Sequence, residues 1–157
     1  MNYNDLTRRH FENPAHAGVL VGVAVRLEGR AEAGVLAGVA VRLEGRAQAG
    51  VLADPAVRRG AAGSEAQGTW VQFDVQVGSG PGEIIDGVRF LAYGCPHVIA
   101  VSDWIAQQAV GRQAKPQLPE GVQSLRERFD VPTEKLGRLL IVEDAWIAAV
   151  SSPHCGL

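Results

Sequence analysis

Two stretches of the chain alternate apolar and polar residues, which is the period of a β-strand. In Thr69–Val77 the apolar side begins at Val71, and the even-numbered residues, Asp74 among them, are predicted to face the other way. Glu83–Ala92 alternates in the same manner, and the glycine-rich turn Gly78–Gly82 joins the two stretches. The pattern therefore predicts an antiparallel β-hairpin.

Apolar residues three or four positions apart predict helices elsewhere in the chain. The apolar positions of the last of these helices include Leu136, Leu139, Leu140, Ile147 and Val150. N-cap residues, prolines and glycines set the expected limits of each helix. The predicted helices are a first one capped by Asn4 or Asp5 and ended by Asn13-Pro14, one from Pro96 to Gly111, a short one over Gly121–Phe129, and a last one capped by Thr133.

A tandem repeat of 16 residues separates the first helix from the hairpin. Ala15–Arg30 and Ala31–Arg46 differ at two positions, and Ala47–Ala62 begins in the same way before it diverges. Alanine and leucine favour a helix, but the alternation, the valines and the internal glycines favour strands. We predict that residues 15–62 are an insertion that extends a sheet edge with β structure, where self-association is a risk. Ala61–Gly68 is predicted to be a loop.

Composition narrows the classes of function. With 157 residues and a net charge of -2, residues 1–157 are expected to form a single domain without attraction for nucleic acid or membranes. No apolar run has the length of a membrane span, and the N-terminus is polar. The two cysteines, Cys95 and Cys155, are too few for a disulfide framework, so a cytoplasmic location is expected.

The junction Tyr93-Gly94-Cys95-Pro96-His97 joins the second strand of the hairpin to the longest apolar helix. Pro96 suits the first helical position, where its missing N–H is not needed. Cys95 is therefore expected at a helix N-terminus, which favours a thiolate. Such a position suits a metal ligand or a reactive sulfur, and it equally suits a plain, partly buried cysteine. Cys95 and His97 are too close along one helical turn to form a nucleophile–base pair, so an enzyme is not expected.

Four stretches, in this order, resemble the U-type iron–sulfur cluster scaffold family, the IscU/NifU N-terminal domain. They are similar to the family's E-N-P opening, its I-x-D-x-x-F-x-x-x-G-C hairpin, its C-x-x-x-I-A-x-S helix and its closing E-D-A-x-x-A-A. The stretches are YNDLTRRHFENPAHAG at 3–18, EIIDGVRFLAYG at 83–94, CPHVIAVSD…AVGR at 95–112 and EDAWIAA at 143–149. The resemblance implies an α+β fold, a small antiparallel sheet with helices packed on one face. It also implies a non-enzymatic scaffold for iron–sulfur cluster assembly, with a cysteine desulfurase or other assembly factors as partners.

The ligand set that the resemblance implies is incomplete in this chain. Family scaffolds hold a [2Fe–2S] cluster or a zinc ion with three cysteines, an aspartate and sometimes a histidine. Cys95 matches one of these cysteines, Gln67 and Thr69 replace a cysteine and the aspartate, and Gly137 and Arg138 replace the histidine and the last cysteine. A single thiolate is too few for a cluster, which takes four ligands, mostly sulfur. Arg138 would repel a cation and either pairs with the Cys95 thiolate or is a solvated helix charge.

Other residues of donor type remain, namely His10, His97, His154 and Cys155. One hypothesis is a rearranged zinc or iron site made by Cys95, His97 and the tail pair His154-Cys155. The other assigns ordinary roles, with His97 as an exposed first-turn residue and Cys155 as an exposed tail thiol. Three functions therefore stay open. They are a scaffold degenerate in cluster binding, a metal-free interaction protein that binds other assembly factors, and a zinc-binding domain.

Overall fold

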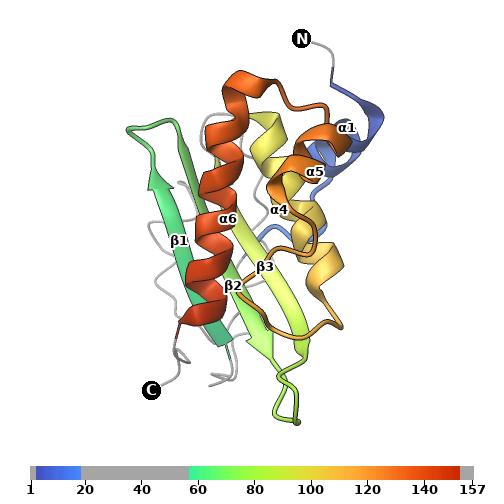
Figure 1. The fold of residues 1–157 in the computed structure, drawn as a ribbon, viewed down its shortest axis with the longest axis vertical. Coiled ribbons are helices and arrows are strands. Elements are labelled where there is room, and N and C mark those ends of the chain that lie inside the picture. The colour runs from blue at the N-terminus through green and yellow to red at the C-terminus, as the bar shows by residue number, and fades with distance from the viewer. Residues whose placement is uncertain (1–2, 19–56, 153–157) are drawn as a thin grey trace.

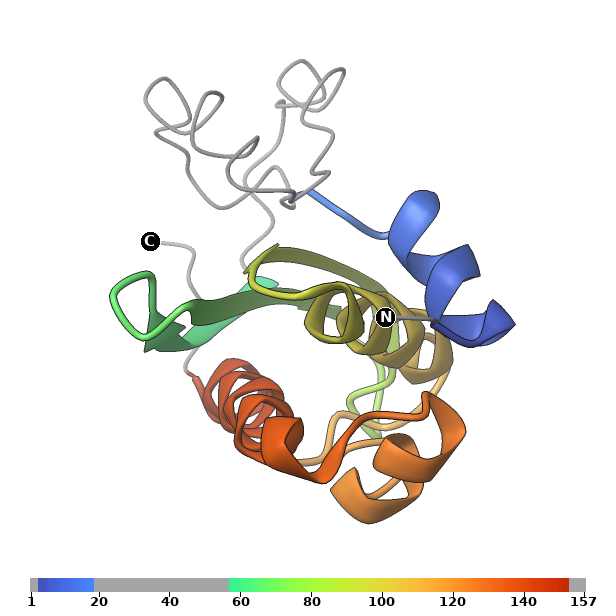
Figure 2. The ribbon, with the colours of Figure 1, turned by 90° about the horizontal axis from the view of Figure 1, so that it is seen from above.

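The computed structural model describes residues 3–18 and 57–152 and shows a three-stranded antiparallel sheet with helices on one face. The strands follow the order β1-β2-β3, with α6 over β1 and β2 and α4 over β3 (Figure 1, Figure 2). The predicted α+β fold is thus confirmed. The elements are α1 (Asp5–Glu12), β1 (Val57–Ser64), β2 (Thr69–Val77), β3 (Ile85–Tyr93), α4 (Pro96–Ala109), α5 (Val122–Arg128), the 3-10 turn η1 (Thr133–Lys135) and α6 (Leu136–Ser151).

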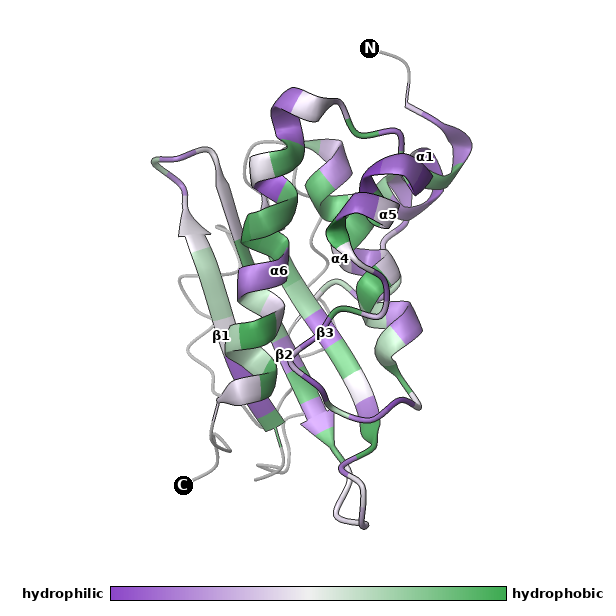
Figure 3. Cartoon of the chain, in the orientation of Figure 1, coloured by the Kyte–Doolittle hydropathy of each residue, from purple (hydrophilic) through white to green (hydrophobic). Residues whose placement is uncertain are grey.

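The core lies between the sheet and the two helices α4 and α6. The apolar side of β2 is fully buried from Val71 to Val77, and Phe90 of β3 lies beside Phe73 in register. Figure 3 shows the apolar residues concentrated on the strands and on these two helices. The indole of Trp146 meets the Phe73 ring edge-on, with 5.4 Å between ring centroids. This contact packs α6 against β2, the middle strand of the sheet.

Strand β1 corrects the prediction of a loop over Ala61–Gly68. Residues 57–64 pair with β2, and only residues 65–68 form the turn. Alanine and glycine have little strand propensity of their own, so local sequence gives a weak signal here. They fit because α6 crosses β1 closely: a Cβ on Gly60 would lie 2.0 Å from the backbone nitrogen of Ala149. The rest of the repeat, residues 19–56, lies outside the described residues.

Two of the apolar residues of α6 are not buried. Leu140 and Ile147 are 46% and 36% exposed. The helix uses another side against the sheet, where Leu139, Val142 and Trp146 are buried. The apolar positions of this helix are so numerous that their spacing alone does not show which side faces inward.

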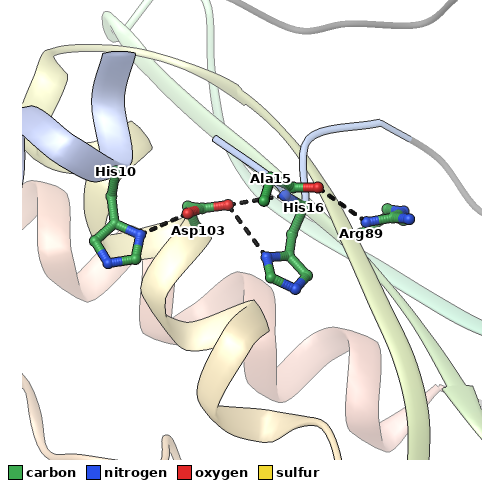
Figure 4. Close-up of polar contacts among 5 residues, drawn as sticks. All are labelled: His10, Ala15, His16, Arg89 and Asp103. Atoms are coloured by element: carbon green, nitrogen blue, oxygen red, sulfur yellow. Dashed lines mark hydrogen bonds and ion pairs between the residues drawn. The ribbon is translucent and has the colours of Figure 1, made fainter. Parts of the chain in front are cut away.

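A buried carboxylate in α4 holds the N-terminal segment (Figure 4). Oδ2 of Asp103 lies 2.6 Å from Nδ1 of His10 in α1, and Oδ1 accepts a hydrogen bond of 2.9 Å from the backbone N–H of His16. Nδ1 of His16 lies 3.4 Å from the same Oδ1. The chain then follows the edge of β3, where the Gly18 N–H donates to the Phe90 carbonyl. Asp103 therefore joins the N-terminal segment to α4, although the two are about 90 residues apart in sequence.

The close contact at Gly60 predicts a large effect of one added methyl group. Gly60→Ala is expected to lower the free energy of unfolding by about 2–3 kcal/mol, because the methyl overlaps the backbone of α6. Gly80→Ala is the control, since nothing lies within 4 Å of that position, and a change below about 0.5 kcal/mol is expected. Urea unfolding followed by circular dichroism measures both. Equal losses in the two variants would contradict the close approach of α6.

Asp103 predicts a pH dependence of stability. Burial raises the pKa of this carboxyl, but the hydrogen bonds from His10 and His16 outweigh burial and lower it below 3.8. Ionised Asp103 therefore stabilises the fold above about pH 4, and this contribution is lost as the pH falls through the lowered pKa.

Asp103→Asn is expected to lower the free energy of unfolding at pH 7 by about 3 kcal/mol, because the imidazoles of His10 and His16 lose their charged partner. Its stability is also expected to fall less steeply with acid than that of the native chain. Asp144→Asn, at an exposed position of α6, is the control and should keep the native dependence. Urea unfolding at pH 7 and at about pH 2.5 tests this, and an unchanged acid dependence in Asp103→Asn would argue against it.

Candidate functional site

The candidate site lies at the end of the sheet where β3 leads into α4. Cys95 is the N-cap residue of α4 and Pro96 is its first residue, as the sequence predicts. Because Trp70 of β2 pairs with Tyr93 of β3, the β1–β2 turn and Thr69 lie at this same end of the sheet. The first turn of α6 carries Arg138 to this end as well. The family positions that the sequence separates by up to 71 residues, from 67 to 138, are thus gathered at one end of the molecule.

Cys95 is half-buried and its thiol is surrounded by groups that favour the thiolate. Burial raises the pKa of Cys95, but interactions with His97, with the backbone N–H of Val98 and with Arg138 outweigh burial. The positive charge of Arg138 acts in the same direction, and together these groups lower the pKa from 9.0 to about 6. At pH 7 the sulfur is therefore mostly a thiolate. Of the two interpretations of Arg138, the structure supports the one that places it beside Cys95.

His97 is a buried residue, contrary to the expectation of an exposed first-turn side chain. It is 2% exposed, and the Tyr3 ring packs edge-on against its imidazole with 4.8 Å between centroids. Its Nδ1 is buried and forms no hydrogen bond with the described residues. The buried hydroxyl of Thr69 is unpaired in the same way. Two unsatisfied polar atoms therefore belong to residues at this end of the sheet, although buried polar atoms are normally hydrogen-bonded.

The remaining predicted site residues lie in different surroundings. Gln67 is exposed in the β1–β2 turn, and the space around Gly137 is open, with nothing within 4 Å of an added Cβ. His10 is committed to Asp103 and not to Cys95. His154 and Cys155 lie outside the described residues. The structure therefore brings Cys95, His97 and Arg138 together and gives no location for the tail pair.

Among the residues that the structure describes, the donors at this end do not make a complete cluster site. In residues 3–18 and 57–152, no three His, Cys, Asp or Glu side chains are grouped so that they would hold a metal ion. Arg138 adds a permanent positive charge where a cation would have to approach the thiolate. The same described ranges contain no helix with the length and apolar character that crossing a membrane requires.

Comparison with known proteins identifies the family. A family model described as the NifU-like N-terminal domain matches residues 45–154. The chain belongs to this family. A crystal structure of a candidate iron–sulfur cluster assembly scaffold protein for the SUF system, from the thermophile Fervidobacterium islandicum, has a similar fold with a TM-score of 0.51. It is 10% identical over 96% of this chain and 95% of that chain, so it supports the fold of the NifU-like domain and nothing more specific. Among curated proteins, none matches this chain.

Asp103 is the residue that sequence reasoning missed in this NifU-like domain. It is a charged residue within an otherwise apolar run, and it is 2% exposed. An aspartate in such a run is a usable signal, because carboxylates are almost never fully buried unless they are paired. Its partners were not evident, since His10 and His16 are about 90 residues away in sequence, 93 and 87 residues respectively.

The Cys95 environment predicts an alkylation profile. In a Cys155→Ser background, the rate of reaction with iodoacetamide is expected to rise with pH around a midpoint of about 6. Arg138→Gln is expected to move this midpoint upward, because the thiolate loses a positive neighbour. Arg126→Gln is a matched control on α5 and should leave it unchanged. Mass spectrometry of the Cys95 peptide measures the rates. The same pH midpoint in Arg138→Gln as in the native chain would exclude the ion pair between Cys95 and Arg138.

Proposed function

We propose that this chain works in iron–sulfur cluster assembly as a non-enzymatic, scaffold-type protein that does not hold a complete cluster with its own donors. Membership of the NifU-like N-terminal domain family supports a role in assembly. The small number of donors supports the proposal that the chain does not hold a complete cluster. Cys95 is the cysteine found among the described residues, and a cluster needs several sulfur ligands.

The observation that carries this proposal is the contact between Cys95 and Arg138. Arg138 stands where the family resemblance implies a cysteine ligand. Its guanidinium stabilises the Cys95 thiolate, and so the thiolate is balanced without a metal ion. A cluster would have to displace this guanidinium and would gain no sulfur ligand from position 138. The arginine at position 138 therefore opposes cluster binding in two ways: it occupies the thiolate, and it supplies no sulfur ligand.

The proposed partners are a cysteine desulfurase or other iron–sulfur assembly factors, and the proposed location is the cytoplasm. In this function the scaffold surface binds its partner without needing a cluster, so the chain serves as an interaction or regulatory protein within the assembly system. The sheet-edge role of repeat 15–62, with self-association through it, remains a separate prediction for a segment that lies mostly outside the described residues.

A zinc-binding domain is the second candidate function, and one observation favours it. Nδ1 of His97 is buried and unpaired two residues from Cys95, and imidazole with thiolate is a common zinc donor pair. His154 and Cys155 would have to complete this site. Arg138 opposes it for the reason given above.

Anaerobic reconstitution with iron and sulfide, followed by visible absorption, tests the proposed function. The native chain is expected to give less than about a tenth of the cluster absorbance of Gln67→Cys/Thr69→Asp/Arg138→Cys, which restores the donors of the family. In that triple variant, Cys95→Ser is expected to abolish the gain, because it removes one of the three sulfur ligands.

The control is Arg8→Cys/Arg126→Cys, which adds the same number of thiols away from the site and should stay at the native level. Strong cluster bands in the native chain that depend on Cys95 would overturn the proposed restriction. Elemental analysis of the same purified samples decides the second candidate. A full equivalent of zinc, lost in Cys95→Ser, would replace the metal-free interpretation with the zinc-binding one.

A further inference from the structure

A cavity of about 290 Å³ lies at the end of the molecule opposite Cys95. It is open to solvent and is lined by the first residue of β3, the end of α4, the link from α4 to α5, and α6. Ile85, Ala109 and Trp146 lie behind its surface and are each 1% exposed, so its accessible apolar surface comes from the partly exposed Leu118 and Pro119. Arg112 and Lys115 from the link also line it. In Figure 1 this link passes along the lower end of the sheet.

Hydrogen bonds fix the wall that the link provides. The Ile85 N–H donates to the Arg112 carbonyl at 2.8 Å, and the Ala114 N–H donates to the Glu83 carbonyl at 2.9 Å. Further along, Nε1 of Trp146 donates to the carbonyls of Lys115 and Gln117 at 3.2 and 3.1 Å. The link is therefore held by β3 on one side and by α6 on the other. The cavity is formed before any ligand arrives, which lowers the cost of binding.

The charges around this cavity are unbalanced. Neither Arg112 nor Lys115 forms an ion pair with a described residue, and no Asp or Glu lines the cavity. Asp86 and Glu120 adjoin lining residues in sequence but do not line the cavity; Glu120 is paired with Arg128 at 2.8 Å, and Glu83 is paired with Arg58 at 2.7 Å. Both cations are thus available to a ligand, and an anion is the charge that they would attract.

We propose that this cavity binds a small organic anion. A phosphate or carboxylate group would lie between Arg112 and Lys115, and a compact apolar body would rest against Leu118 and Pro119. The volume is close to the lower end of the range of small-molecule sites, about 300–1,000 Å³. With a net charge of -2 on the chain and two cations at the rim, a nucleic acid would find no extended basic surface here. This site is independent of Cys95 and of the proposed role in cluster assembly.

Isothermal titration with phenyl phosphate and with benzoate tests the proposal, since the two probes share a ring and differ in the anionic group. At least one is expected to bind saturably at a single site. Arg112→Gln/Lys115→Gln is expected to weaken that binding at least about tenfold, because both charge-assisted contacts are lost. Arg8→Gln, an exposed arginine of α1, is the matched control and should leave the affinity unchanged.

Two further probes separate charge from shape. Benzylamine carries the same ring with the opposite charge and is expected not to bind, while inorganic phosphate lacks the apolar body and should bind at least about tenfold more weakly than phenyl phosphate. Absence of saturable binding for both anions, or an affinity that the double variant leaves unchanged, overturns the site. If inorganic phosphate binds as tightly as phenyl phosphate, the proposed contact with the apolar body of the ligand is wrong. Circular dichroism of the double variant verifies its fold, which uses only the backbone of Arg112.

Discussion

The close packing of α6 on β1 is the constraint on which both ends of this molecule depend. A glycine at position 60 lets the backbone of Ala149 approach the strand, and the Phe73–Trp146 contact holds the same helix over β2. Since a helix is a stiff rod, fixing its depth over the sheet also fixes the residues that it carries at either end. One end brings Arg138 to the Cys95 thiolate. The other places Trp146 in the wall of the cavity.

The elements that could be predicted are those whose pattern is local. The period of Thr69–Val77 gave both limits of β2, and Pro96 with Gly111 marked the limits of α4 to within two residues. The end of β1, residues 61–64, could not be predicted in this way, because its small residues fit against α6 and have little strand propensity. Leu140 and Ile147 show the converse, because apolar residues all around a helix hide the side that faces the core.

The same distinction applies to the candidate site. The place of Cys95 at a helix N-terminus follows from its neighbours in sequence, so it was accessible to sequence reasoning. The burial of His97 was not, because the covering ring belongs to Tyr3, which is 94 residues earlier. The partners of Asp103 likewise come from the N-terminal segment. Contacts between distant segments decide the environment of each of these side chains, and a single sequence carries little trace of them.

Cluster binding and fold draw on different residues in this domain. The core is built from apolar side chains of β2, β3, α4 and α6, and none of the positions 67, 95, 137 or 138 belongs to the fully buried apolar set. Ligands at such positions can therefore be replaced without loss of the packing that maintains the fold. Once an arginine occupies position 138, the thiolate of Cys95 gains a permanent positive partner, and the bare anion is no longer costly in the absence of a metal. In the proposed function, this ion pair stabilises the metal-free state of the site, and the scaffold surface binds other assembly factors without a cluster.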